Sequence, residues 1–141
     1  DALLESLTKV KHAKLNTNSD QKIRIILDEN SKGSFQGKIR VDENSDGTQA
    51  NMSGKSLLLS NKARVNSKPE LEILADDVRC SHGVTVGNLS LDQLFYLRSR
   101  GIPDIEARKL LVSSFGNIII DDLNVNLASR AKQIMLEYNN D

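Results

Sequence analysis

Several residue types are scarce in this chain of 141 residues, which has no tryptophan, one cysteine, two prolines and only 4% aromatic residues. A single cysteine cannot form an internal disulfide, and this is typical of a protein in a reducing compartment. Because aromatic rings are few, a core has to be built mainly from leucine, isoleucine and valine. The length is sufficient for one core of modest size.

Net charge is also absent, because 19 basic residues balance 19 acidic ones. We therefore expect no nucleic acid or acidic membrane held by bulk charge. No apolar run approaches the ~18 residues of a membrane span, and no signal peptide is visible. The chain begins with Asp1 rather than methionine. We expect a C-terminal part of a longer protein, whose upstream part could hold a targeting segment.

Short strands separated by polar turns are predicted from residue 22 onward. Apolar residues recur there at every second position, which is the side-chain period of a strand. The phrases DENSKG (28–33) and DENSDG (42–47) are rich in residues that stabilise turns. Repeated units of this kind predict the coils of a β-solenoid or a β-sandwich. Pro69 is expected at a strand entrance, where its missing N–H matters least.

The phrase DENSDG also resembles the opening of an EF-hand calcium loop, through Asp42, Asn44, Asp46 and Gly47. The twelfth position of such a loop is a bidentate glutamate, but here it is Ser53. The flanking segments also read as strands rather than helices. We therefore interpret this phrase as a turn.

The first fifteen residues have no decisive pattern. Their apolar residues lie at helical spacing (Leu3, Leu4, Leu7 and Val10), and the segment stays unassigned. His12 has no evident partner nearby in the sequence, so we expect it to be exposed.

Beyond residue 89 the period becomes 3.6, which predicts helices that pack on one another. Ser90 and Gln93 form a capping box, and Gly101 is placed to end the first helix. Pro103 suits the first turn of a second helix. This helix could end at Gly116 or include residues 118–120. A last helix has an apolar face of Leu127, Ala131, Ile134 and Tyr138.

Cys80 and His82 lie two positions apart where the strand region ends. A strand places them on one face, together with three valines (Val78, Val84 and Val86). On residue type alone both could be core residues. They could also share a soft metal ion, but two ligands do not complete a site that wants about four. A third interpretation is an enzyme with Cys80 as nucleophile and His82 as base, although no orienting acid is evident.

The stretch LEILADDVRCSHGVTVG, followed by LDQLFYLRSRGI, resembles the C-terminal signature of the SufD family of the SUF iron–sulfur cluster assembly machinery. Weaker similarity extends from Gln21 to Phe115. Cys80 and Gly83 favour SufD over its sister SufB. The sequence departs from the family pattern by an apolar exchange at Val84 and another at Leu74.

The resemblance implies a mainly β protein with C-terminal helices. Residues 1–89 would form the final coils of a right-handed parallel β-helix, and residues 90–141 a helical region that caps it. The family role is a non-catalytic scaffold that pairs with SufB and docks the SufC ATPase through its helices. The location would be the bacterial cytoplasm or the plastid stroma.

The family positions that match Cys80 and His82 lie at the SufB interface and take part in building the cluster. The resemblance therefore implies a transient iron–sulfur cluster whose iron is held only with partner ligands. ATP would enter through SufC, and the chain alone would bind no stable cofactor. In isolation we expect self-association, as a homodimer, through an exposed solenoid edge. The alternative is a structural or binding β-solenoid in which Cys80 and His82 only pack.

Overall fold

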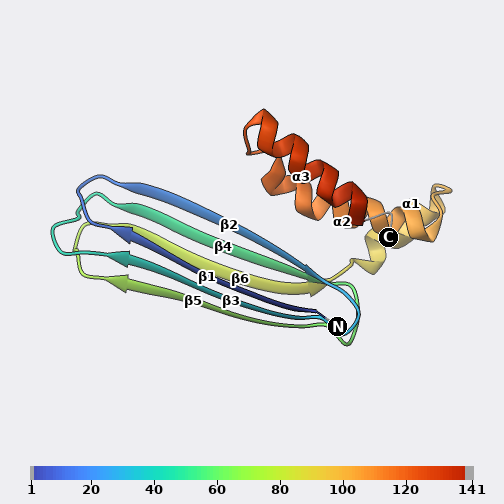
Figure 1. The fold of residues 1–141 in the computed structure, drawn as a ribbon, viewed down its shortest axis with the longest axis horizontal. Helices are drawn as coiled ribbons and strands as arrows, with labels where there is room; N and C mark the ends of the chain where they lie inside the picture. The colour runs from blue at the N-terminus through green and yellow to red at the C-terminus, as the bar shows by residue number, and fades with distance from the viewer. Residues whose placement is uncertain (1, 139–141) are drawn as a thin grey trace. The chain divides into compact units, whose positions relative to one another are not determined.

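The computed structural model describes residues 2–138, which form six strands followed by three helices (Figure 1). The strands are β1 (Leu3–His12), β2 (Asn18–Leu27), β3 (Lys32–Val41), β4 (Gln49–Leu58), β5 (Arg64–Ile73) and β6 (Arg79–Asn88). The helices are α1 (Leu91–Ser99), α2 (Asp104–Ile120) and α3 (Val125–Tyr138). The chain divides into two compact units, residues 1–87 and 88–141. The predicted mainly β chain with C-terminal helices is confirmed.

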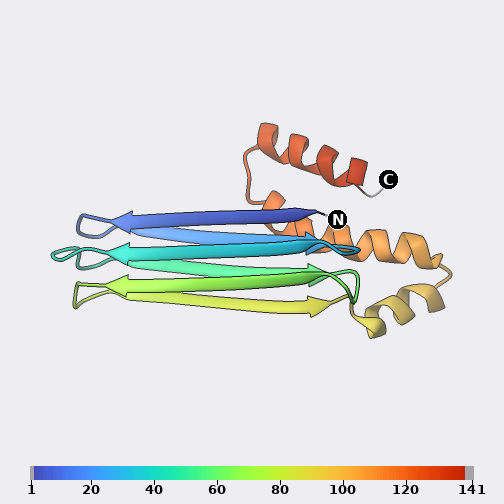
Figure 2. The same cartoon turned by 60° about the horizontal axis from the view of Figure 1, so that its bottom comes forward.

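The strands form two parallel sheets, which we call sheet A (β1-β3-β5) and sheet B (β2-β4-β6). Figure 2 shows these sheets as two layers whose strands run in opposite directions. Each strand pairs with the strand two places away in the sequence, so Leu3 lies beside Lys32 and Lys32 beside Arg64. This order is that of a solenoid, because a meander would pair consecutive strands. The right hand of the coil and the capping role of the helices stay predictions.

The core of the strand unit lies between the sheets and is apolar. Its buried members are Ile25, Leu27, Phe35, Ile39, Val41, Ala50, Met52 and Ala63. Gly37 has no room for a side chain, because a Cβ there would lie 2.5 Å from Met52 Sδ and 2.6 Å from Phe35 Cζ. Phe35 and Met52 are themselves fully buried. The absence of a side chain at Gly37 therefore gives Phe35 and Met52 the space that they occupy in the core.

The turns of successive coils also bond to one another. The Asn16 N–H donates to Asp46 O at 2.9 Å, and the Gly47 N–H donates to Asp77 O at 2.7 Å. Asn44 and Gly47 have positive φ angles of 58° and 74°. The interpretation of DENSDG as a turn is confirmed, and its Asp42 carboxylate is engaged by lysine and arginine side chains.

In the strand unit, a segment without a sequence assignment forms a strand, and one expectation is wrong. Residues 3–12, unassigned above, form the edge strand β1, in which Thr8, Val10 and His12 alternate with more exposed residues. The helical spacing of the leucines was misleading because the more buried positions recur at every second residue and include the polar residues Thr8 and His12. Pro69 lies inside β5 rather than at its entrance. It is tolerated there because β5 is an edge strand of sheet A and pairs with one strand among the described residues.

The first helix follows its predicted signals. Ser90 Oγ accepts from the Gln93 N–H at 3.3 Å, and Gly101, with φ of 87°, follows the end of α1. In α2, however, Gly116 does not end the helix. It is buried, and a Cβ there would lie 2.9 Å from Met135 Cε of α3. Gly116 is therefore a close-approach position between α2 and α3.

The predicted apolar face of α3 is only partly correct. Leu127 and Ile134 are exposed by 53% and 56%, whereas Ala131 and Met135 are half-buried. The side chain of Tyr138 and residues 139–141 lie outside the described part of the chain. No helix within residues 2–138 has the length and apolarity to cross a membrane.

Candidate functional site

Cys80 and His82 lie on β6, the last strand of sheet B, which pairs with β4 alone among the described strands. Cys80 is half-buried and packs against the core, and Val84 lies near Gly54 of β4. His82, two positions along the same face, is exposed because no described strand continues the sheet beyond β6. We call this edge, formed by β5 and β6, the terminal edge of the solenoid.

The chemistry of Cys80 is that of a partly desolvated thiol. Burial raises the pKa of the Cys80 thiol, and a backbone hydrogen bond with Ala50 offsets part of that rise. An activated nucleophile needs a lowered pKa, because the thiolate is the reactive form. The surroundings of Cys80 shift its pKa in the opposite direction.

His82 is not the core histidine that residue type alone allowed, since its ring is exposed. Period-two geometry places it about 6.5 to 7 Å from Cys80 between Cα atoms. Within residues 2–138, no group of three or more His, Cys, Asp or Glu side chains could hold a metal ion. The site offers a thiol and an imidazole on an open edge, and the described residues supply no third ligand.

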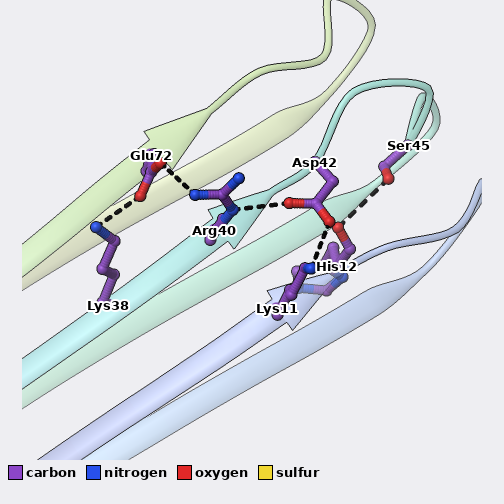
Figure 3. Close-up of polar contacts among 7 residues, drawn as sticks. All are labelled: Lys11, His12, Lys38, Arg40, Asp42, Ser45 and Glu72. Carbon is purple, nitrogen blue, oxygen red and sulfur yellow. Dashed lines mark hydrogen bonds and ion pairs between the residues drawn. The ribbon is translucent and has the colours of Figure 1, made fainter.

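His12 is the buried histidine of this chain, which corrects the expectation of an exposed ring. It is 4% exposed, and its Nδ1 and Nε2 lie 2.7 Å from Thr17 Oγ1 and 2.9 Å from Ser19 Oγ. Ser45 Oγ donates to its backbone carbonyl at 3.3 Å (Figure 3). The partners of the imidazole ring come from the following turn and strand. Within the sequence, the alternation along β1 was the signal that could have revealed this burial. We assign it a structural role.

A network of charges crosses the outer face of sheet A (Figure 3). The Glu72 carboxylate of β5 accepts from Lys38 Nζ and Arg40 Nη1, each at 2.6 Å. Asp42 accepts from Arg40 Nε at 2.7 Å and from Lys11 Nζ at 2.8 Å. The hydrogen bond from Lys11, followed by that from Arg40, lowers the pKa of Asp42. Lys38 is the main cause of the lowered pKa of Glu72. Sequence analysis missed this network because only the strand register brings its members together.

The outer face of sheet B carries a ladder of polar side chains. Asn51 Nδ2 donates to Asp20 Oδ1 and Ser81 Oγ donates to Asn51 Oδ1, both at 2.8 Å. These side chains line a shallow hollow of about 430 Å³, together with Arg79. The ladder links three successive coils and lies on the face opposite to Cys80.

The helical unit exposes much apolar surface. Its exposed large side chains are Leu91, Phe95, Tyr96, Ile105, Leu110, Ile118, Leu123, Val125, Leu127, Ile134 and Leu136. Tyr96 and Leu97 of α1 and Leu111 of α2 line an open hollow of about 400 Å³. So large an apolar content on a small surface is typical of an interaction site.

Comparison with known families identifies the strand unit, α1 and most of α2. Residues 1–115 match the family described as SUF system FeS cluster assembly, SufBD core domain. The chain belongs to this family. The match covers Cys80, His82 and the charge network, so all of these lie within the family's core domain.

Individual relatives agree with this assignment. The chain is 43% identical over 116 residues to an iron–sulfur cluster assembly SufBD family protein of Synechocystis, which covers 82% of this chain and 26% of the relative. It is 40% identical over 111 residues to the iron–sulfur cluster assembly protein SufD of Escherichia coli, covering 79% and 26%. It is 44% identical over 97 residues to chloroplastic protein ABCI7 of Arabidopsis thaliana, covering 69% and 20%. The chain thus spans about a quarter of the length of these relatives.

Proposed function

We propose that this SufBD-family chain is part of a non-catalytic scaffold in SUF iron–sulfur cluster assembly, and that its terminal edge pairs with a SufB-like protein. The observation that carries the proposal is the position of Cys80 and His82 on β6, a strand with one neighbour. Unpaired N–H and C=O groups along an edge strand favour the addition of a strand from a partner. Pairing there would bring the partner's side chains beside the thiol and the imidazole.

The cluster is the cargo of this site, not a resident cofactor. Thiolate and imidazole are both suitable iron ligands, and some clusters use both. Because Cys80 and His82 have no third ligand among residues 2–138, iron binding requires partner ligands. The chain alone is therefore expected to bind iron weakly. Because burial raises the pKa of Cys80, iron would have to displace the thiol proton in order to bind there.

The helical unit is proposed to dock a SufC-like ATPase, through which ATP enters the assembly. The exposed apolar side chains of the three helices support this part of the proposal. The bacterial and chloroplastic relatives support a place in the bacterial cytoplasm or the plastid stroma. The free terminal edge also supports self-association of the isolated chain, which a monomeric mass at high concentration in solution scattering would contradict.

The second candidate is a structural β-solenoid without a cluster role. The half-burial of Cys80 against the core favours it, since a packing residue would have this environment. Under this interpretation, serine at residue 80 and alanine at residue 82 leave cluster assembly intact.

Co-purification separates the two candidates. The parent protein is expressed with SufB and SufC counterparts as wild type, Cys80→Ser, His82→Ala and the control Thr85→Ala, which changes an exposed residue of the same strand. We expect the complex in all four cases, with less bound iron in the first two variants only. Unchanged iron would leave Cys80 as a packing residue and His82 as an exposed residue without a role in the cluster site. Failure of the wild type to bind either counterpart would contradict the scaffold proposal.

A further inference from the structure

The outer face of sheet A is strongly basic although the whole chain has no net charge. Strand register fixes which side chains share this face. The cations are Lys9, Lys11, Lys32, Lys38, Arg40, Arg64 and Lys68, and the carboxylates are Glu5, Glu70 and Glu72. The face therefore carries an excess of positive charge that composition alone conceals.

Three cation pairs lie directly opposite one another on neighbouring strands of this face. The register pairs Lys9 with Lys38 and Lys11 with Arg40 between β1 and β3. Lys32 pairs with Arg64 between β3 and β5. Like charges at directly opposite positions destabilise a sheet. Residues that break a local rule of stability in this way are expected at functional surfaces.

The nearby carboxylates neutralise only one part of the face. Asp42 and Glu72 accept ion pairs from Lys11, Lys38 and Arg40. The ion pairs found within residues 2–138 include none to Lys9, Lys32 or Lys68, and all three are exposed. These lysines are free to meet an external anion.

The geometry of the face fits an extended chain. Side chains two residues apart on a strand lie about 6.5 to 7 Å apart, as do those of an extended peptide. Lys11 is paired with Asp42, so the acidic residues of such a segment would meet Lys9 on β1, Lys32 on β3 and Lys68 on β5. Leu3 and Leu7 are exposed by 69% and 77% on the same face of β1. The exposed leucines and Glu70 favour a polypeptide over nucleic acid as the partner. The phosphates of a nucleic acid would make no favourable contact with the leucines and would be repelled by the carboxylate.

We propose that the outer face of sheet A binds an extended acidic segment of a partner protein. Lys9 and Lys32 provide free charges, and Leu3 and Leu7 provide apolar contacts at the edge. This surface is distinct from the terminal edge, because the outward side chains of sheet A point away from the core that Cys80 contacts. The inference does not depend on the cluster role.

The test titrates the full chain into a fluorescein-labelled 16-residue peptide of alternating glutamate and threonine at an ionic strength of about 0.15 M, with anisotropy as the readout. The variant Lys9→Gln/Lys32→Gln is compared with Lys14→Gln/Lys55→Gln, which removes two exposed lysines elsewhere. We expect the first variant to bind about fivefold to tenfold more weakly, as for two exposed ion pairs. We expect the affinity of the control variant to change less than about twofold, because charges outside the binding face act on the peptide only through a screened long-range attraction.

Thermal unfolding of the same variants supplies the second readout. Removing opposed charges should leave the melting temperature of Lys9→Gln/Lys32→Gln unchanged or higher, because repulsion is relieved. A lower melting temperature would show that these lysines stabilise the fold and would overturn the proposal. Equal weakening in both variants, or no binding by the wild type, would do the same. A single-stranded DNA of 16 nucleotides that binds at least as tightly would replace the acidic protein by nucleic acid.

Discussion

Gly37 gives a sharp test of packing at the scale of a single residue. Its missing side chain lets Met52 and Phe35 close over β3, so we expect Gly37→Ala to destabilise the fold by about 1–3 kcal/mol through overpacking. Urea unfolding measures this change. Gly54→Ala is the matched control, because its Cβ would meet Val84 Cγ2 at 3.6 Å, an ordinary contact. Equal losses in both variants would contradict the packing argument.

Cys80 should react slowly with iodoacetamide at neutral pH. Burial raises the pKa of its thiol, so less thiolate is present in the folded chain than in the unfolded one. The rate is measured against pH with and without urea, and we expect the folded midpoint at the higher pH. A folded midpoint below that of the urea-unfolded chain would favour the nucleophile interpretation.

Single residues also show how far sequence reasoning reaches. The pair Cys80 and His82 was correctly placed on one strand, since alternation with valines is a local signal. The environment of each side chain was not predictable, because it depends on which strand is last in the sheet. His12 was missed for a similar reason, since Thr17 and Ser19 contact it only after the chain reverses.

At the scale of elements, Gly116 controls the packing of α3 on α2. We expect Gly116→Val to displace α3, because even a Cβ would lie 2.9 Å from Met135 Cε. The expected result is lower helical circular dichroism and faster proteolysis of residues 121–138. Valine has the higher helix propensity, so propensity alone predicts the opposite sign. Ser114→Val, at an exposed position of α2, should change neither signal.

The turns show why element types were easier to predict than their geometry. The letters DENS occur twice, yet the positive φ falls on Glu29 in the first copy and on Asn44 in the second. The first copy closes a short connection between β2 and β3, in which Ser31 N donates to Asp28 O. The second belongs to the longer connection between β3 and β4. Composition predicts a turn in both places, whereas the two connections differ in length and in the residue that takes the positive φ.

At the scale of the whole molecule, the charge network joins all three strands of sheet A and should make stability depend on pH. The pKa values of Asp42 and Glu72 are lowered in the folded chain, so their contribution is fully present above the ordinary carboxyl values of about 4. It is lost as pH falls through the lowered values. We expect Asp42→Asn to lower the melting temperature at pH 7, with a difference that shrinks toward pH 2.

Glu5→Gln is the control for this prediction, because it neutralises an exposed carboxylate of β1 that lies outside the network. Added salt should also reduce the effect of Asp42→Asn, since exposed ion pairs are screened. A difference between wild type and Asp42→Asn that stays constant down to pH 2 would contradict the electrostatic origin.

Fold class was readable from the chain because strands, turns and helices each have their own periodicity. Register was not, and both the opposed cations and the network depend on it. The positions of Lys9 and Lys38, 29 residues apart, become neighbours only through parallel pairing. Side chains that are neighbours on the surface of a solenoid therefore lie about one coil apart in the sequence. A local sequence pattern does not reveal them.

The alternating strand order also has a mechanical consequence. Each coil bonds only to the coils before and after it, and Asn18 is followed by its neighbour Gln49 after 31 residues. A pulling force on the ends of the strand unit would therefore peel off one coil at a time. Each rupture would release about 100 Å of chain at roughly 3.3–3.6 Å per residue. The strand unit should therefore lengthen under load in regular steps, each the length of one coil.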